Sequence, residues 1–362
     1  DELARQGVLY CNMHSMPLSC PSRVQAMTGV YNDRNYVNFG YINDDEHTFA
    51  QLAQTAGYST AMVGKWQLGR SREIPEWCLN QLEMYKEFAP GTMGKYTDRY
   101  ANSYIDNNGR YDLSLYGPDA FQNYCYDFID RMVASGKPFL LYYNTPLVHT
   151  PHTPTPDSES WDLDYAGRFI GDAKNFPDMV AYLDKQVGQL VNHLKTAGIW
   201  DNTILIFTAD NGTSTRIVSE LADGTKVRGG KGTPLHTGTH VPLIITWGDK
   251  IEKGRVCNRL VDLTDFMPTF ADAMQVQIPA EWYPDGVSLY PELVGDTPLE
   301  KKLILCHFNP LWPTTPCPLA SRFAQTADYK YYWDGRFYNV SNDLNEENPL
   351  DVSHLSEEVQ TV

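Results

Sequence analysis

The hydrophobic residues of the chain follow a helical period in three stretches. Residues 46–58 and 117–137 show this spacing, and the apolar residues between Pro177 and Gly198 fall on one stripe. A glycine stands at or next to the carboxyl end of each stretch, where helices commonly terminate. The pattern predicts three amphipathic helices, and it also places the first ten residues inside an amphipathic helix.

Short apolar runs alternate with these helical stretches and predict strands. They lie within residues 59–69, 138–146, 202–212 and 240–248. The run before Asp210 is continuously apolar, which is typical of a parallel sheet covered on both faces. Helices alternating with such strands predict an α/β fold, with a central, mostly parallel sheet flanked by helices.

The pattern of apolar and turn residues changes after about Pro298. The runs "KKLILCHF", "KYYWDG" and "RFYNVSND" are short, apolar and separated by turn residues. They predict a small antiparallel sheet at the carboxyl end. We therefore divide the chain into a main domain, residues 1–298, and a C-terminal subdomain, residues 299–362.

Charge and cysteine content exclude several classes of protein. The formal net charge of −16 and the pI near 4.9 argue against a nucleic-acid partner, although a local cluster of Lys and Arg can still bind a small anion. No apolar run approaches the roughly 18 residues that a membrane span requires, so no span is predicted. The seven cysteines lack metal-ligand spacing, and their odd number excludes complete pairing within the chain.

Polar side chains follow three of the predicted strands. Lys65 comes after the first run, His149 after the second, and Asp210 with Asn211 after the third. Ligands of open α/β sheets bind at the carboxyl ends of the strands. The pattern therefore predicts an active site at this edge.

The segment "PLSCPSRVQAMTG", residues 17–29, offers two adjacent nucleophiles, Ser19 and Cys20. At a helix N-terminus either one meets backbone N–H groups and the positive end of the helix dipole, which suit an anion. Arg23 lies about one turn further on and would face the same anion. The alternative is a helix cap followed by a first-turn proline, with Arg23 in a surface ion pair.

The same segment resembles the signature of the sulfatases, in which Cys or Ser, any residue, Pro, Ser and Arg occur in order. In that family the first of these residues is converted to formylglycine, so the resemblance implies that Ser19 is modified and that Cys20 occupies the variable position. The aldehyde of formylglycine binds water as a geminal diol, in which one hydroxyl attacks sulfur and the second expels sulfate afterwards. The resemblance implies an alkaline-phosphatase-like fold.

Two further segments carry the resemblance. "AMVGKWQLG" matches a Gly-Lys-Trp-His segment, which implies that Lys65 binds a sulfate oxygen; Gln67 replaces the usual His and can line the substrate site without acting as an acid. "VHTPHTPTPDS" matches the His-x-Pro segment, which implies that His149 protonates the leaving alcohol and that His152 lines the substrate cleft. The plainer alternatives are a solvated loop lysine at position 65 and an ordinary loop residue at 152.

A fourth segment begins at "ADNG" and extends through "RGGKGTPLHTGTHVPLI". The resemblance implies that Asp210 and Asn211 are ligands of a divalent cation, expected to be Ca²⁺ because their oxygens are hard ligands. It also implies that Lys231 holds a sulfate oxygen. Arg228 and His236 are weaker candidates for substrate binding. Taken alone, Asp-Asn-Gly is also a common turn composition.

The chain departs from the family at its beginning. The family begins with a strand that ends in paired Asp residues, and here Asp1 lies only 18 positions before Ser19. We therefore expect the chain to be a fragment of a longer gene or to be poor in metal. Without that strand the sheet would expose an apolar groove.

As a sulfatase the protein would act on a sulfated carbohydrate or a small sulfate ester, would require a formylglycine-generating maturase, and would be periplasmic or secreted. Two alternatives stay open: a phosphoester or phosphonate hydrolase of the same superfamily, and a catalytically inactive protein that binds sulfated glycans.

Overall fold

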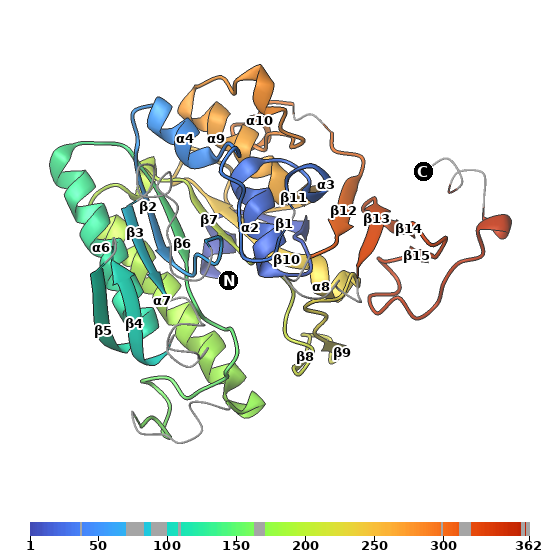
Figure 1. The fold of residues 1–362 in the computed structure, drawn as a ribbon, viewed down its shortest axis with the longest axis horizontal. Coiled ribbons are helices and arrows are strands. Elements are labelled where there is room, and N and C mark those ends of the chain that lie inside the picture. Colours follow the sequence, from blue (N-terminus) through green and yellow to red (C-terminus); the bar gives the residue numbers. More distant parts are fainter. Residues whose placement is uncertain are drawn as a thin grey trace. The chain divides into compact units, whose positions relative to one another are not determined.

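The computed structural model describes residues 1–36, 38–69, 83–87, 100–107, 110–162, 171–297, 300–310, 320–355 and 359 (Figure 1). These residues form two compact units. The first joins Asp1–Phe49 to Thr203–Val362, and the second is Ala50–Asn202. The boundary predicted at residue 298 does not coincide with this division and stays a prediction.

A four-stranded sheet organises the first unit, in the order β11-β1-β10-β7. Its strands are β1 (Gly7–His14), β7 (Leu205–Thr208), β10 (His240–Thr246) and β11 (Arg255–Asp262). Strand β1 runs parallel to β11, and β10 runs antiparallel to both β1 and β7. The sheet is therefore mixed, and the α/β class is as predicted. The apolar run of β7 predicts parallel pairing, whereas β7 pairs antiparallel with β10.

The predicted helix over the first ten residues is also wrong for most of its length. Helix α1 covers only Glu2–Arg5, and the chain then enters β1. A Cβ at Gly7 would lie 2.1 Å from the carbonyl oxygen of Ile245, so the close approach of β10 requires glycine there. Val8, Tyr10 and Met13 of β1 are buried in the core of this unit.

Helix α2 (Ser19–Thr28) is buried along its whole length, and all ten of its residues lie inside the protein. It ends at Gly29, which adopts a left-handed conformation (φ 70°) and leaves no room for a side chain because a Cβ would lie 2.6 Å from the Cβ of Met267. Met267 belongs to α9 (Phe266–Met274), which packs against α2.

The second unit is built on a five-stranded sheet in the order β5-β4-β3-β2-β6. Its strands are β2 (Ser59–Gly64), β3 (Glu83–Glu87), β4 (Ala101–Asn107), β5 (Arg110–Tyr116) and β6 (Phe139–Asn144). Strand β2 is parallel to β3 and to β6, whereas β3, β4 and β5 pair antiparallel. The site-bearing strands β2 and β6 therefore end at the same edge.

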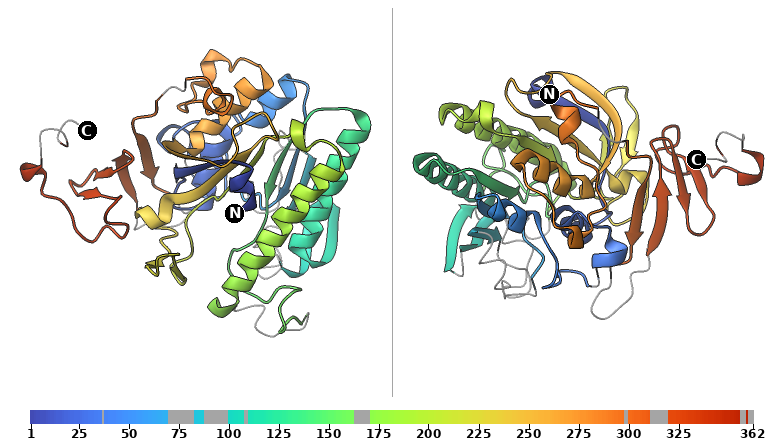
Figure 2. Two further views of the ribbon diagram at one scale, coloured as in Figure 1. Left: turned by 180° about the vertical axis from the view of Figure 1, so that it is seen from behind. Right: turned by 90° about the horizontal axis from the view of Figure 1, so that it is seen from above.

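The three predicted helices are confirmed, with shorter bounds. They are α4 (Phe49–Thr55), α6 (Gly117–Ser135) and α7 (Phe176–Thr196). Helix α6 packs across the strands of the second unit and α7 packs against α6 (Figure 2). Among the described helices, none has both the length and the apolar character that crossing a bilayer would need.

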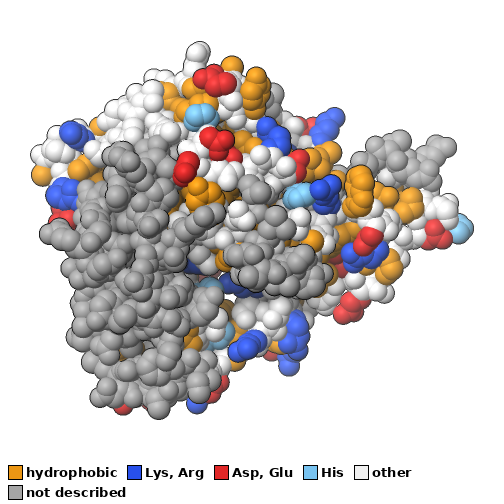
Figure 3. Space-filling view, viewed as in Figure 1, with side chains coloured by type: hydrophobic (Ala, Val, Ile, Leu, Met, Phe, Trp, Pro, Cys, Tyr) orange, Lys and Arg blue, Asp and Glu red, His pale blue; other side chains and the backbone are white. Residues whose placement is uncertain are grey.

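The C-terminal part forms the predicted antiparallel sheet, with strands β12 (Ile304–Phe308), β13 (Ser321–Gln325), β14 (Tyr329–Tyr332) and β15 (Phe337–Asn339) in sequential order. One face carries the buried residues Cys306, Phe323 and Tyr332. The other face exposes Leu305 and Tyr331, and hydrophobic side chains are visible among charged ones at that end of the molecule (Figure 3).

The remaining elements are short. They are α3 (Asn32–Asn35), α8 (His236–Thr239), α10 (Tyr290–Leu293), β8 (Val218–Glu220) and β9 (Lys226–Arg228), together with 3-10 helices at Ala173–Asn175, Trp200–Asn202, Leu263–Asp265, Ala280–Trp282 and Val352–His354.

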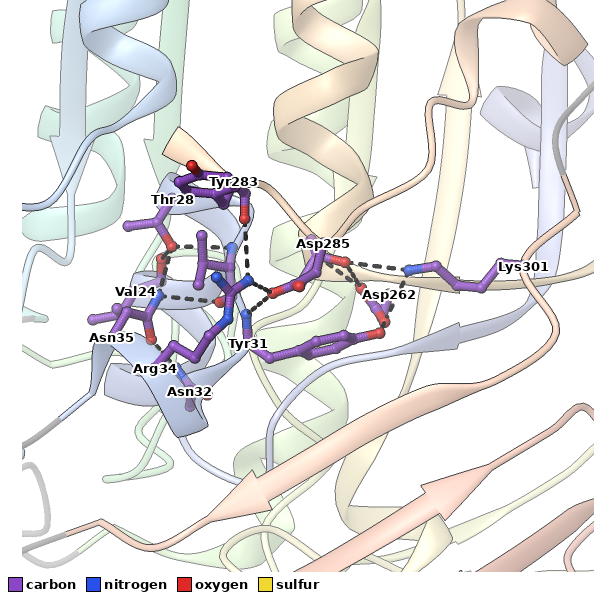
Figure 4. A network of polar contacts seen from close by, with 12 residues as sticks. Val24, Thr28, Tyr31, Asn32, Arg34, Asn35, Asp262, Tyr283, Asp285 and Lys301 are labelled. Atoms are coloured by element: carbon purple, nitrogen blue, oxygen red, sulfur yellow. Dashed lines mark hydrogen bonds and ion pairs between the residues drawn. The ribbon is translucent and has the colours of Figure 1, made fainter. Parts of the chain in front are cut away.

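A buried ionic network fixes the segment that follows α2. Lys301 Nζ lies 3.0 Å from Asp262 Oδ2 and 2.7 Å from Asp265 Oδ1. The hydroxyl of Tyr31 donates to the same Asp262 oxygen at 2.8 Å, and the Tyr31 amide donates to Asp285 (Figure 4). Asp262 and Asp265 also form the capping box of the turn Leu263–Asp265. The ammonium of Lys301 therefore neutralises two carboxylates that would otherwise be a buried pair of like charges.

Candidate functional site

The segment between β1 and α2 is held by one serine. Ser22 Oγ donates to the carbonyl oxygen of Leu18 at 2.9 Å and accepts from the amide of Met16 at 3.1 Å. Leu18 is the extended residue that precedes the helix, and it has no polar side chain with which to cap it. Ser22 therefore fixes the chain path that places Ser19 at the first position of α2.

The two candidate nucleophiles have different surroundings. Cys20 is completely buried, with no exposed surface. Ser19 donates from Oγ to Asn211 Oδ1 at 3.1 Å. Because Asn211 follows β7, this hydrogen bond joins the beginning of α2 to the carboxyl end of a strand nearly 200 residues away in the sequence.

Arg23 and Asp210 form an ion pair, with Nη2 and Oδ2 2.9 Å apart and side-chain exposures of 5% and 28%. The spacing predicts Arg23 one turn beyond Ser19, and the helix places it there. The buried guanidinium of Arg23 contributes positive charge beside Ser19, which hydrogen-bonds Asn211. Four predicted residues, Ser19, Arg23, Asp210 and Asn211, thus meet in one unit.

Lys231 is brought to this cluster by backbone packing. Its amide donates to the carbonyl oxygen of Thr213 at 3.0 Å, and the amide of Gly232 donates to that of Pro17 at 2.8 Å. A Cβ at Gly212 would lie 2.0 Å from the carbonyl oxygen of Thr237, so the two strand-end segments approach too closely for any side chain. The half-buried Lys231 therefore lies on a loop that is bonded to the segment preceding Ser19.

The weaker candidates lie elsewhere in the same unit. Arg228 is exposed on the β8–β9 hairpin and donates to the carbonyl oxygen of Thr215 at 3.0 Å. His236 is buried, with its ring centroid 4.6 Å from that of His240 and 5.4 Å from that of His14. Burial, followed by the charges of His240 and Lys330, lowers the pKa of His236 to about 3, so this imidazole is neutral at working pH.

The other predicted residues belong to the second unit. Lys65 follows β2, is buried, and donates its amide to the carbonyl oxygen of Asn144 at the end of β6, at 2.8 Å. Gln67 adopts φ 57°, an uncommon conformation for a residue with a side chain. The pairing of β2 with β6 thus places Lys65 at the edge where the segment carrying His149 begins.

The segment carrying His149 and His152 is held by side chains that hydrogen-bond its backbone carbonyl oxygens. The hydroxyl of Tyr100 donates to the carbonyl oxygens of Pro146 and His149, and Nδ1 of His149 lies 2.7 Å from the carbonyl oxygen of Thr150. His152 is buried, and its carbonyl oxygen accepts from Asn175 at 3.0 Å.

The described residues do not make up a complete calcium site. Ca²⁺ takes six to eight oxygen ligands, and no group of three or more His, Cys, Asp or Glu able to hold a metal occurs in the part of the chain that the structure describes. Asp210 Oδ2 is paired with the Arg23 guanidinium, and Asn211 Oδ1 accepts from Ser19. A cation would have to compete with both of these donors.

Sequence patterns did not identify Lys330 and Glu346, a buried ion pair that contacts the loop of Lys231. One signal was present. In β14 the inward positions alternate with outward ones, and Lys330 stands between Tyr329 and Tyr331 at a completely buried position. A lysine in the inward register of a strand requires a buried partner.

Comparison with known proteins adds the family. The family model described as Sulfatase matches residues 1–276. The chain is 31% identical over 345 residues to an uncharacterized sulfatase of Escherichia coli (strain K12), YdeN, with 86% of this chain and 59% of that protein covered. The chain thus spans less than two thirds of the length of this relative.

Two solved structures are similar in fold. The crystal structure of Ps i-CgsB in complex with k-i-k-neocarrahexaose matches with a TM-score of 0.77 and 23% identity, covering 98% of this chain and 82% of that one. The structure of BT4656 in complex with its substrate D-glucosamine-2-N,6-O-disulfate matches with a TM-score of 0.76 and 20% identity, covering 100% and 89%. These likenesses establish the shared α/β fold.

Proposed function

Because the chain belongs to the sulfatase family, we propose that the protein hydrolyses sulfate esters with a nucleophile derived from Ser19 by oxidation to formylglycine. One observation carries the proposal. Ser19 begins a buried helix beside Arg23, Asp210 and Asn211, whereas the adjacent Cys20 is sealed in the core. The hydrated aldehyde at position 19 would supply one hydroxyl that attacks sulfur, and its second hydroxyl would then expel sulfate.

The residues around Ser19 have separate tasks in this reaction. The first-turn amides of α2 and the guanidinium of Arg23 favour negative charge at the helix N-terminus. Asn211 orients the group at position 19 through its side-chain oxygen. Lys231 supplies a cation to the sulfate oxygens, on which negative charge develops as sulfate is transferred.

The second unit supplies the remaining proposed groups. We assign to His149 the proton that the leaving alcohol needs, because imidazole titrates near neutral pH and its basicity suits both donation and recovery of a proton. Lys65 would bind a sulfate oxygen, and Gln67 and His152 would contact the substrate. A neutral amide at position 67 can donate a hydrogen bond but cannot transfer a proton.

A sulfated carbohydrate is the proposed substrate class, supported by the disulfated glucosamine bound as substrate to BT4656. Calcium stays a prediction of the sequence, and we derive no step through a metal because Asp210 and Asn211 alone do not form its site. A formylglycine-generating maturase is the proposed partner, and a periplasmic or secreted location is proposed with it.

The substrate preference tests the proposal directly. We expect the matured whole protein to hydrolyse an aryl sulfate with a higher kcat/KM than the corresponding aryl phosphate, since the site is proposed to hold a sulfate monoester. Initial rates on the two nitrophenyl esters measure this. A clear preference for phosphate would favour a phosphoester or phosphonate hydrolase, and binding of sulfated glycan without turnover by the matured protein would favour an inactive binding protein.

Removing the charge of Lys231 is expected to lower kcat/KM by about 10²–10³-fold, the usual effect of deleting one donor to a developing oxyanion. The variant is Lys231→Met, which keeps the length and the apolar stem of the side chain. Lys226→Met, on the exposed strand β9, is the matched control and should stay within about twofold of the parent. Equal losses of kcat/KM in the two variants would show that Lys231 has no specific role in the site.

A further inference from the structure

A buried polar cluster projects from the C-terminal sheet toward the loop that carries Lys231. Lys330 Nζ lies 2.8 Å from Glu346 Oε1, and the hydroxyl of Tyr332 donates to Glu346 Oε2. The Lys330 and Glu346 side chains are 0% and 1% exposed. The ammonium also lies 3.9 Å from the ring centroid of Phe323, which offers it the negative face of an aromatic ring.

The hydrogen bonds of this cluster end on the backbone of the Lys231 loop, residues 229–236. The carbonyl oxygen of Pro234 accepts from Lys330 Nζ, and at 3.1 Å it shares with Glu346 Oε2 the single proton of the Tyr332 hydroxyl. The amide of His236 donates to Glu346 Oε1 at 2.6 Å. Three bonds thus fix two backbone groups, three and five residues after Lys231.

The other end of the same loop is bonded to the candidate site. The amides of Lys231 and Gly232 donate to the carbonyl oxygens of Thr213 and Pro17. The C-terminal sheet supports that side as well, because Met16 and the partly buried Leu18 pack into the cluster that contains Phe323 and Tyr332. The loop is therefore held between the nucleophile segment and the C-terminal sheet.

Burying an ion pair carries a desolvation penalty that can exceed the attraction between its two charges. Desolvation lowers the pKa of Lys330 despite the opposing effect of Glu346, so the ammonium is held in a place that disfavours its charge. An apolar pair of similar volume would often give equal or greater stability. What an apolar pair could not provide is directional bonds to Pro234 and His236.

We propose that Lys330, Tyr332 and Glu346 are positioning residues for Lys231. The C-terminal sheet then sets the position of the Lys231 ammonium, which binds sulfate, without itself contacting the substrate. The inference rests on the proposed function for its catalytic consequence. Its structural part, that the cluster orders residues 229–236, holds or fails independently of turnover.

Two variants of the matured whole protein test this. Tyr332→Phe removes one hydroxyl and keeps the ion pair, and Glu346→Gln removes the carboxylate charge while keeping the side-chain shape. We expect each to lower kcat/KM by about 10- to 100-fold, mainly through kcat, because small misplacement of a catalytic group has effects of this size. Combined with Lys231→Met, each should cause less than about a further twofold loss, because the effects of coupled residues are not additive.

Two controls separate positioning from general destabilisation. Glu347→Gln changes the exposed neighbour of Glu346, and Glu292→Gln changes a mostly buried carboxylate of α10 that pairs with Arg259 of β11. Both should leave kcat/KM within about twofold of the parent. Full additivity with Lys231→Met, or equal losses in the controls, would overturn the inference.

Hydrogen exchange gives a readout that needs no turnover. In Tyr332→Phe and Glu346→Gln we expect the amides of Lys231 and Gly232 to exchange faster than in the parent, while the amides of β1 keep their protection. If the parent shows no sulfatase activity but these amides lose protection, the proposed function fails and the positioning role stands. Unchanged exchange of the loop amides in both variants would overturn the positioning role.

Discussion

Ser19→Ala is expected to lower turnover of an aryl sulfate by roughly 10⁴-fold or more, because the substitution removes the atom that becomes the nucleophile. Cys20→Ala should retain most of the activity, since Cys20 faces the core and has no exposed surface. The effect of Cys20→Ala should instead be a moderate loss of stability from a small cavity. Steady-state kinetics and urea unfolding of both variants measure the two effects.

Conversion of Ser19 can be observed directly. The peptide that contains the aldehyde should weigh about 2 Da less than the serine peptide, because two hydrogens are lost when the nucleophile is formed. Ser19→Cys should keep activity in a host that matures cysteine, and the unmodified serine protein should be nearly inactive. Inactivation by Cys20→Ala, with an active Ser19→Ala protein, would show that the assignment is one position wrong.

Lys301→Met is expected to lower the free energy of unfolding by about 3–5 kcal/mol at pH 7, because it leaves Asp262 and Asp265 buried without their cation. The pair of aspartates is held at the turn into α9, and its network extends to Tyr31 beyond α2 (Figure 4). Lys302→Met is the matched control, since Lys302 is exposed, and it should change stability by less than about 0.5 kcal/mol. Urea unfolding measures both.

The loss in Lys301→Met should depend on pH in a defined direction. Burial and then the charge of Asp262 raise the pKa of Asp265 to about 6, against the opposing effect of Lys301. Because this folded-state pKa exceeds the unfolded value of about 4, the folded protein binds more protons, and the stability contributed by Asp265 falls as pH rises from about 4 to 6. Without Lys301 the pKa of Asp265 rises further.

The deficit of Lys301→Met relative to the parent should therefore be larger at pH 7.5 than at pH 5.0. Lys301 itself adds no pH dependence in this range. Although burial acts to lower its pKa, Asp262 and Asp265 raise it on balance above the usual value, so its stabilising charge is lost only in alkaline solution. An equal deficit at both pH values would show that Asp265 does not titrate as described.

Local patterns were sufficient for much of the secondary structure. The three helices and the antiparallel C-terminal strands have side-chain periods that any short window reveals. The placement of Arg23 about one turn beyond Ser19 also follows from local spacing. These features depend on contacts between residues close in sequence, so a short window of residues is enough to predict them.

Strand partners and strand directions depend on contacts between residues far apart in the sequence. The residues of β1 carry a weak local signal, and they form a strand because β10 and β11, more than 200 residues later, pair with them on both sides. The antiparallel pairing of β7 with β10 is equally non-local. Nothing in the segment around Asp210 specifies that Arg23 will neutralise it, or that Lys330 will reach Pro234. Such pairs are selected by the burial of charge, whose energy depends on which distant groups the whole fold brings within a few ångströms.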